Sequence, residues 1–336
     1  MNKINYVDCW QTIIDTFYFL YLFIGARGIG KTYSVLKGLI NQKSKFLYVR
    51  LTDTELKNSV SPLNNPFKTL NTDLKRDIQI IKVKGADTYG ILDNETGDII
   101  GTAGALSVFG KYRGVDFSNV DYIIFDEFIP KGYRQANKNQ AIDFFDMLET
   151  VNRNRELQGK SPIKVILLSN SNSLQSPILN SLGLPEIINQ MRKNNKEIYT
   201  DNERGIYLQV FKNIDVSNAK SQTSLYKLTR GTDFYKMAIE NEFYTENFNN
   251  VKKVPYRNLI PWANLENMYF YDIKGSSKIY ISSHKSVLSK SYIFTKETVN
   301  DFKKQYGFNL QYLFDKDLIL YEDYNIKNDF YNMLLK

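Results

Sequence analysis

The sequence has only one cysteine, Cys9, and one histidine, His284, among its 336 residues. A single cysteine excludes a disulfide framework within the chain and fits a reducing cytosol. With one residue of each kind, the chain also lacks the ligands of an ordinary structural zinc site. We therefore expect little imidazole chemistry, and we expect His284 at a strand end or on the surface.

Long apolar segments are also missing. The most apolar stretch near the N-terminus, residues 17–24, follows Asp15 and holds eight residues, whereas a helix that crosses a bilayer needs about 20. We interpret this stretch as a buried central strand and expect a soluble, cytoplasmic protein. The sequence shows no internal repeats, heptads or low-complexity tracts.

What is present is the composition of a globular protein. Hydrophobic residues make up 43% of the chain and aromatic residues 14%, which excludes wholesale disorder. The length is enough for about two domains, each with its own core. The net charge of +8 is spread along the chain, which suits a partner with a phosphate backbone without requiring one.

The most informative motif follows the apolar run. Gly25, Gly30, Lys31 and Thr32 fit the phosphate-loop pattern G-x-x-x-x-G-K-[ST]. In this pattern backbone N–H groups surround the phosphates, the lysine reaches the β- and γ-oxygens, and the threonine hydroxyl ligates Mg²⁺. The motif therefore predicts a site for ATP and Mg²⁺ formed by Gly25, Ala26, Arg27, Gly28, Ile29, Gly30, Lys31 and Thr32. A glycine-rich turn that matches by chance is the alternative.

Strands and helices alternate through the first two thirds of the chain. The patterns predict an amphipathic segment at 1–16, strands at 19–24, 45–50, 103–109, 120–125 and 163–168, a hairpin between 78 and 101, and helices at 32–41, 53–59 and 135–157. In the longest helix, Ile142, Phe145 and Leu148 have helical spacing. Such alternation implies an α/β fold with a mainly parallel sheet covered by helices on both faces.

The pattern changes after residue 214. Residues 215–245 are polar and helical, and strands are then expected at 268–273, 278–282 and 292–294. Helices follow, one from the N-cap Thr295 to Tyr306 and one over 325–335. We therefore predict an ATPase domain at 1–214, a helical linker region at 215–245 and a smaller α/β domain at 246–336.

Asp126 and Glu127 lie where an apolar strand ends, about 100 residues after the phosphate-loop motif. In nucleotide hydrolases an aspartate at this place holds Mg²⁺, and a following glutamate polarises the attacking water. The alternative is a pair of strand-end carboxylates that face solvent. Asn170 ends the next strand and is a candidate for contacting the γ-phosphate or the water, or it simply caps the strand.

Basic residues at two places are candidates for a further cation at the site. Arg153 and Arg155 close the long helix, where one of them could serve as an arginine finger for the ATP of a neighbouring subunit. Favourable interaction with the helix macrodipole explains them equally well. Lys111 and Arg113 are a second candidate source of charge at a subunit boundary, or a solvated basic loop.

These motifs occur in a recognisable order. Taken together, they resemble the genome-packaging ATPases of phi29-like tailed phages, which are ring-forming translocases of double-stranded DNA. The resemblance covers most of the chain and rests on residues 23–33, 48–50, 106–108, 125–128, 150–156 and 168–170, continuing weakly through 230–233 and 269–273. Only the phosphate-loop motif is distinctive by itself.

The resemblance implies a P-loop NTPase domain and a C-terminal domain similar to a ribonuclease H-like nuclease that has lost its activity. It also implies a homo-oligomeric ring, typically a pentamer, that docks on the phage portal and moves double-stranded DNA into an empty capsid. A structural RNA can bridge motor and portal in that family. By position, Arg153 matches the family's trans-acting finger, and Arg113 lies where relatives carry a basic residue. Such a motor acts in the host cytoplasm, transiently at the prohead portal, and is not part of the mature virion.

Two other functions fit the same residues. One is a terminase-type ATPase whose C-terminal domain still cuts DNA, for which Asp272 on a predicted strand would supply the first carboxylate. Two-metal nucleases need three or more converging carboxylates, and the sequence shows no such convergence among Asp315, Asp317, Glu322, Asp323 and Asp329. The other is a nucleotide-dependent assembly switch that binds RNA or a protein.

Overall fold

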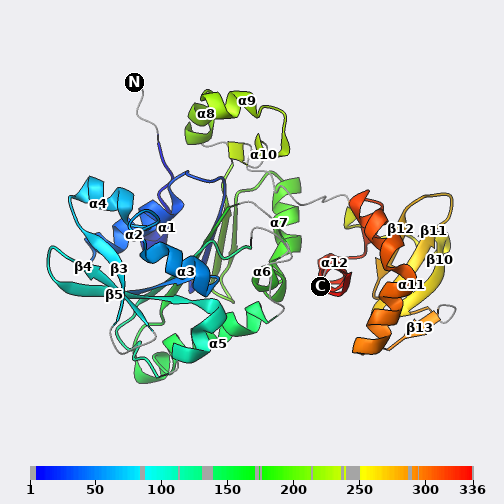
Figure 1. The fold of residues 1–336 in the computed structure, drawn as a ribbon, viewed down its shortest axis with the longest axis horizontal. Helices are drawn as coiled ribbons and strands as arrows, with labels where there is room; N and C mark the ends of the chain where they lie inside the picture. Colours follow the sequence, from blue (N-terminus) through cyan, green and yellow to red (C-terminus); the bar gives the residue numbers. More distant parts are fainter. Residues whose placement is uncertain are drawn as a thin grey trace. The chain divides into compact units, whose positions relative to one another are not determined.

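A computed structural model describes residues 5–83, 88–112, 114–130, 139–170, 174, 176–212, 215–235, 238–239, 250–286, 290–293 and 295–334. The chain divides into two compact units (Figure 1). The first comprises residues 1–131, 139–173 and 191–244, and the second comprises 132–138, 174–190 and 245–336. No helix of the described residues is long and apolar enough to cross a membrane.

The first unit is built on a nine-stranded sheet with the order β3-β4-β5-β2-β6-β7-β1-β9-β8. Its strands are β1 (Leu20–Ile24), β2 (Phe46–Arg50), β3 (Ile78–Lys82), β4 (Tyr89–Asp93), β5 (Asp98–Ala105), β6 (Tyr122–Asp126), β7 (Lys164–Ser169), β8 (Ile198–Asp201) and β9 (Ile206–Val210). The six strands from β5 to β9 in this order are parallel, and β4 and β8 run against their neighbours. The expected parallel sheet with a hairpin at its edge is therefore present.

The helices of this unit lie before, between and after the strands. They are α1 (Cys9–Asp15), α2 (Lys31–Asn41), α3 (Asp53–Val60), α4 (Lys68–Leu74), α5 (Gln140–Asn152), α8 (Asp215–Ser221), α9 (Ser224–Leu228) and α10 (Asp233–Tyr235). The last three fall within the stretch expected to be a polar, helical linker. Helix α4 was not predicted, because its residues lie in a Pro- and Asn-rich stretch that resembles a loop.

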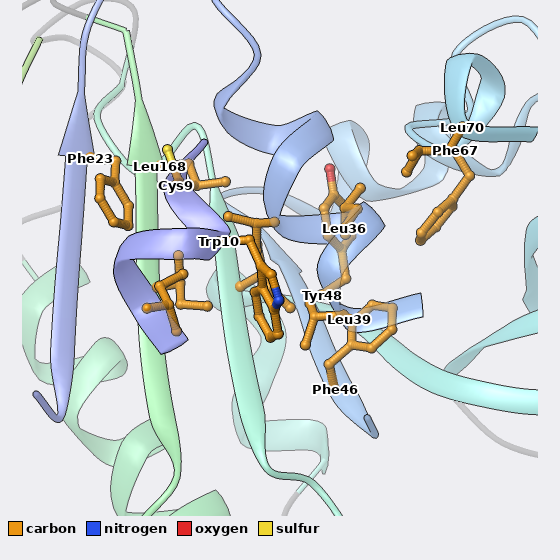
Figure 2. Packing of buried hydrophobic residues seen from close by; sticks show 14 of the residues in the cluster. Cys9, Trp10, Phe23, Leu36, Leu39, Phe46, Tyr48, Phe67, Leu70 and Leu168 are labelled. Carbon is orange, nitrogen blue, oxygen red and sulfur yellow. The ribbon is translucent and has the colours of Figure 1, made fainter. Parts of the chain in front are cut away.

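Both faces of the sheet are covered. On one face, α1 and α2 pack on a continuous apolar core (Figure 2). Ile124 of β6 belongs to this core. On the other face, Phe144 of α5 contacts Phe125, with ring centroids 6.3 Å apart. Ile124 and Phe125 are successive residues of one strand and so point to opposite faces. The sheet is therefore a central layer between two helical layers.

The contact between α1 and α2 depends on a missing side chain. Trp10 lies directly over Gly38, where a Cβ atom would come within 2.1 Å of the indole ring. Trp10 also contacts Tyr122 at 5.4 Å between ring centroids, and Cys9 beside it is buried (Figure 2). In the segment predicted to be amphipathic, residues 1–16, Trp10 and Ile13 are thus buried, whereas Ile14 is 39% exposed.

The second unit has a five-stranded mixed sheet in the order β13-β10-β11-β12-β14. Its elements are α6 (Pro177–Ser181), most of α7 (Leu184–Lys193), β10 (Leu259–Leu265), β11 (Met268–Ile273), β12 (Ile279–Ser282), β13 (Lys290–Tyr292), α11 (Lys296–Asp315), β14 (Ile319–Tyr321) and α12 (Tyr324–Leu334). The predicted N-cap Thr295 is confirmed, because its side chain accepts a hydrogen bond from the Thr298 amide in a capping box. Helix α11 extends beyond the predicted end at Tyr306.

Two expectations about local structure were wrong. Residues 103–109 do not form one strand, because β5 ends at Ala105 and a 3₁₀ helix (Leu106–Tyr112) follows. Its buried residues Leu106, Phe109 and Tyr112 recur every third position, which is the 3₁₀ period.

In the long helix, the residues whose spacing indicated the helix are not the ones that are buried. Ile142 is 61% and Phe145 39% exposed, whereas the neighbouring set Ala141, Phe144, Met147 and Val151 is buried. Both sets have helical spacing, so only packing against the sheet decides which of the two sets is buried. The helix also ends earlier than expected, at Asn152, because Arg153 has a φ of 43°, outside the helical region. Residues 135–138 of the predicted helix lie outside the described part of the chain.

Candidate nucleotide site

The carboxyl ends of four adjacent parallel strands bring the candidate residues together. In the order β2-β6-β7-β1, these strands end at Arg50, Asp126, Ser169 and Ile24. Residues that follow each strand therefore meet at one edge of the sheet, the usual place for a ligand in an open α/β fold. This explains why Lys31, Glu127 and Asn170, which are far apart in sequence, line a common pocket.

The segment with the phosphate-loop motif, which we call loop 25–32, connects β1 to α2. Gly28 and Gly30 have φ values of 72° and 106°, which a glycine adopts without strain. The Lys31 amine donates to the carbonyls of Gly25 at 2.9 Å and Ala26 at 2.8 Å. Burial lowers the pKa of Lys31 to about 8. The loop thus holds a desolvated lysine amine beside backbone N–H groups, which are suited to donate hydrogen bonds to an anion.

A hydroxyl and a carboxylate meet opposite the lysine. The Thr32 hydroxyl donates to Asp126 Oδ1 at 3.0 Å, and the Tyr48 hydroxyl donates to Asp126 Oδ2 at 3.0 Å. Burial raises the pKa of Asp126, while Arg50 nearby acts in the opposite direction. Hydroxyl and carboxylate oxygens are the ligands that Mg²⁺ prefers, so Thr32 and Asp126 fit a magnesium site by the chemistry of their donors.

Arg50 bridges both carboxylates of the site. Its guanidinium lies 2.8 Å from Glu127 Oε2 and 3.4 Å from Asp126 Oδ2. Glu127 has a φ of 56°, a left-handed conformation that is uncommon for a residue other than glycine. Such outliers occur preferentially at functional sites, where the surrounding contacts enforce them. The backbone turn after β6 points the Glu127 side chain into the pocket rather than along the strand.

The pocket has a volume of about 210 Å³ and includes most of the predicted binding residues. It is lined by Arg27, Gly28, Gly30, Lys31, Thr32, Tyr33, Asp126, Glu127, Ser169 and Asn170. Ala26 and Ile29 are buried on the inner side of the loop instead, and Gly25 contributes its carbonyl to Lys31. Asn170 Oδ1 accepts a hydrogen bond from Lys31 at 3.4 Å.

The two candidate finger arginines lie in different environments. Arg155 donates to the carbonyls of Val120 at 2.7 Å and Ser118 at 3.3 Å and pairs with Asp121 at 3.0 Å. Arg153 is exposed, and among the described residues its guanidinium donates only to the carbonyl of Thr150, at 3.2 Å. Neither lines the pocket described above. Arg113 lies outside the described residues, and Lys111 falls in the 3₁₀ helix.

Three residues at this site were not predicted from the sequence to act there. Arg50 is the last residue of the strand predicted at 45–50 and Tyr48 lies within that strand, yet both hold Asp126. Lys220 of α8 donates to the Arg27 carbonyl across 193 positions of sequence. Only the position of Arg50, one strand away from Asp126 at the same edge, could have indicated its role.

The arrangement is that of an α/β protein with a glycine-rich loop and two carboxylates at the carboxyl edge of its parallel sheet. The family model for Podovirus DNA encapsidation protein (Gp16) matches residues 1–306. The chain therefore belongs to the Podovirus DNA encapsidation protein (Gp16) family.

Curated relatives agree with this membership. The DNA packaging proteins of Bacillus phages PZA and phi29 are each 30% identical over 225 residues, which is 66% of this chain and 60% of each relative. The DNA packaging protein of Bacillus phage B103 is 29% identical over 228 residues, 66% of this chain and 64% of the relative. The matched stretch thus spans less than two thirds of each relative's length.

Solved structures share the fold. A chain of the bacteriophage Phi-29 viral genome packaging motor assembly has a TM-score of 0.62 and 22% identity, covering 99% of this chain and all of that one. A chain of the Phi-28 gp11 DNA packaging motor has a TM-score of 0.60 and 16% identity, covering 96% of both chains. At these identities the likeness concerns the fold, a mixed α/β architecture with a parallel sheet and helices.

Proposed function

We propose that this chain is an ATP-hydrolysing motor that translocates double-stranded viral DNA into a preformed capsid. One observation carries the proposal: Lys31, Thr32, Asp126 and Glu127 surround a single pocket at the sheet edge, in a member of a DNA encapsidation family. A cation, a metal-binding pair and a candidate base together are the parts that nucleoside triphosphate hydrolysis needs. A protein that only binds DNA needs none of them.

ATP binding falls to loop 25–32. Lys31 and the backbone N–H groups of the loop hold the phosphates, and Thr32 with Asp126 holds Mg²⁺. The bound ion neutralises charge that develops on the phosphate oxygens. The Thr32–Asp126 hydrogen bond supports this assignment, because it already places both oxygens at the mouth of the loop. Tyr48 and Arg50 fix the carboxylate of Asp126 from the other side.

Hydrolysis falls to Glu127. Its carboxylate lines the pocket and accepts a proton from the attacking water, which Asn170 helps to position. Arg50 fixes the orientation of this carboxylate through the contact at 2.8 Å. Because a general base must be held within hydrogen-bonding reach of its proton, an oriented carboxylate works better than one that rotates freely.

Arg153 supplies a further cation to the ATP of a neighbouring subunit. Its exposure and its single described contact support this role, because its guanidinium stays accessible outside its own pocket. Arg155 is less suited, since its guanidinium is already held by four groups of its own subunit. A finger in trans requires a ring of subunits, for which we propose a homopentamer.

Double-stranded DNA, the phage portal and a structural packaging RNA are the proposed partners, and the site of action is the prohead portal in the host cytoplasm. For the second unit we propose a ribonuclease H-like domain without nuclease activity. Asp272 of β11 is exposed, and the described residues contain no group of three or more His, Cys, Asp or Glu that could hold a metal ion. This gives the terminase alternative no support, because a two-metal nuclease needs such a group.

The test is ATP turnover by the full chain in Mg²⁺, with and without double-stranded DNA and over a range of salt concentrations. We expect DNA to stimulate turnover, without sequence preference and less at high salt, because a translocase must contact phosphates. Turnover indifferent to DNA would favour the assembly switch. Cutting of a plasmid in Mg²⁺ or Mn²⁺ would favour the terminase.

A further inference from the structure

Helix α8 places a lysine against loop 25–32. The Lys220 amine donates a hydrogen bond to the carbonyl of Arg27. At the next residue, Gly28, a Cβ atom would lie 2.9 Å from the same amine. The absence of a side chain at position 28 therefore permits the lysine to approach the loop backbone. Residues from the helical segment after β9 thus reach the proposed phosphate site within the first compact unit.

Lys220 adds to a concentration of positive charge. Arg27, Lys31 and Lys220 surround one loop, and none of the ion pairs found among the described residues involves any of them. Burial and then the neighbouring Arg27 lower the pKa of Lys220. Three cations that repel one another are stabilised by an anion placed among them.

We propose that Lys220 is a nucleotide-binding residue, whose amine contacts the phosphate oxygens of the ATP held by loop 25–32. A lysine ammonium has three N–H donors. One goes to the Arg27 carbonyl, and a polyphosphate is the ligand that accepts the others while neutralising the charge. This inference rests on the proposed ATP site. It makes α8 part of that site, although the phosphate-loop motif does not include it.

A purely structural role for Lys220 makes a different prediction. The amine also lies 5.9 Å from the centre of the Tyr226 ring, and Tyr226 stacks on Phe234 at 6.0 Å. If these contacts only fix α8 and α9 to the loop, then losing Lys220 should lower the stability of the protein without nucleotide. If Lys220 binds phosphate, its loss should spare the free protein and weaken the complex.

The experiment compares the full-length variants Lys220→Ala, Lys220→Arg and Lys227→Ala with wild type. Lys227 is an exposed lysine of α9, which makes it a matched control. Affinities for ATP, ADP and inorganic triphosphate are measured by calorimetry, together with the thermal unfolding midpoint without ligand. We expect Lys220→Ala to lose about 10- to 100-fold in affinity for both ATP and triphosphate, the loss typical of a charged hydrogen bond. Lys220→Arg should recover part of it, and Lys227→Ala should match wild type.

The comparison with Lys31→Ala separates this inference from the proposed function. If Lys31→Ala abolishes ATP binding while Lys220→Ala binds ATP and triphosphate as wild type does, the ATP site stands and the role of Lys220 is overturned. A lower unfolding midpoint of free Lys220→Ala with unchanged affinity overturns it in favour of the structural role. If wild type binds neither ATP nor triphosphate, both proposals fail.

Discussion

The guanidinium of Arg50, at the end of β2, lies 2.8 Å from the carboxylate of Glu127, which follows β6. The same guanidinium reaches Asp126 at 3.4 Å. Because β2 and β6 are neighbours in the parallel sheet, this ion pair depends on the strand order and joins two residues 77 positions apart. The side chains are 13% and 31% exposed, so solvent screens the pair only in part. The ion pair fixes the candidate base at the edge of the candidate nucleotide pocket.

The first prediction separates binding from turnover at this carboxylate. Glu127→Gln should bind ATP with near-normal affinity and hydrolyse it at least about 100-fold more slowly, because the amide cannot accept the proton of the attacking water. Lys31→Ala should instead lose ATP binding. Calorimetric titration and steady-state turnover measure the two effects. Normal turnover in Glu127→Gln would show that the base has been assigned to the wrong residue.

The second prediction separates the two arginines after α5. Arg155→Ala should destabilise the protein by about 1–3 kcal/mol, because it leaves backbone carbonyls that Arg155 now binds without a partner. Arg153→Ala should leave the unfolding free energy within about 0.5 kcal/mol and lower ATP turnover strongly. Denaturant unfolding and turnover of the two variants provide the comparison. If Arg153→Ala lost stability and Arg155→Ala lost only turnover, Arg155 would be the finger and Arg153 the structural residue.

Subunit mixing tests whether Arg153 acts in trans. A Glu127→Gln subunit keeps its finger and loses its own site, and an Arg153→Ala subunit has the reverse. Under conditions where mixed rings form, some hydrolysis should return at interfaces where Glu127→Gln supplies Arg153 to its neighbour. No recovery at any ratio would contradict the assignment. Arg155 or Arg113 would then be the next candidate.

The third prediction concerns the tight contact between α1 and α2. Gly38→Ala should destabilise the protein by about 1–3 kcal/mol, because the new methyl group overlaps Trp10 and overpacks the core. Gly307 in α11 is the control, since a Cβ there meets only Lys303 at an ordinary 3.6 Å. Gly307→Ala should stabilise the helix by about 0.5–1 kcal/mol. A gain in stability at both positions would contradict the packing of Trp10.

The fourth prediction uses the only thiol of the chain. Burial raises the pKa of Cys9 to about 12 from an ordinary value of 9.0. Between these values the unfolded chain loses the thiol proton and the folded chain keeps it. The contribution of the protonated Cys9 thiol to the free energy of unfolding is therefore complete below about pH 9, and it is lost as the pH rises toward 12.

Cys9→Ala is the matched variant for this test. Its unfolding free energy should fall less steeply above pH 9 than that of wild type, even though tyrosines and lysines titrate in both proteins. The native wild-type protein should also resist thiol-alkylating reagents at neutral pH, because Cys9 is 1% exposed. Rapid alkylation without unfolding would contradict the buried position of α1.

The local structure around the candidate nucleotide site was the most predictable part of the molecule. A strand, a glycine-rich loop and a helix are local in sequence, so residues 20–41 could be predicted from spacing alone. Asp126 and Glu127 were found because an apolar strand ends abruptly in two charges. Strands ending at one edge of a parallel sheet then necessarily bring these groups together.

What sequence could not provide was pairing between distant elements. The phase of α5 depends on Phe125 across the core, and Arg50 gains its partners only through the order of the strands. Strands β8, β9, β10 and β14 were not predicted either. The three-residue β14 is too short to show alternation, and it gains its hydrogen bonds from β12, far earlier in the chain. Such contacts are properties of the fold and not of any local pattern.

The most direct test of the account is a packaging reaction that contains proheads, DNA, ATP and a chosen ratio of wild-type to Glu127→Gln subunits. The amount of DNA that becomes resistant to DNase is measured. We expect wild type to protect DNA only when ATP is present, and Glu127→Gln to protect none. In mixtures, the amount of protected DNA should fall by more than the fraction of mutant subunits, because one inactive site stalls the whole ring. Full protection by Glu127→Gln, or protection without ATP, would contradict the claim that hydrolysis at this site drives DNA into the capsid.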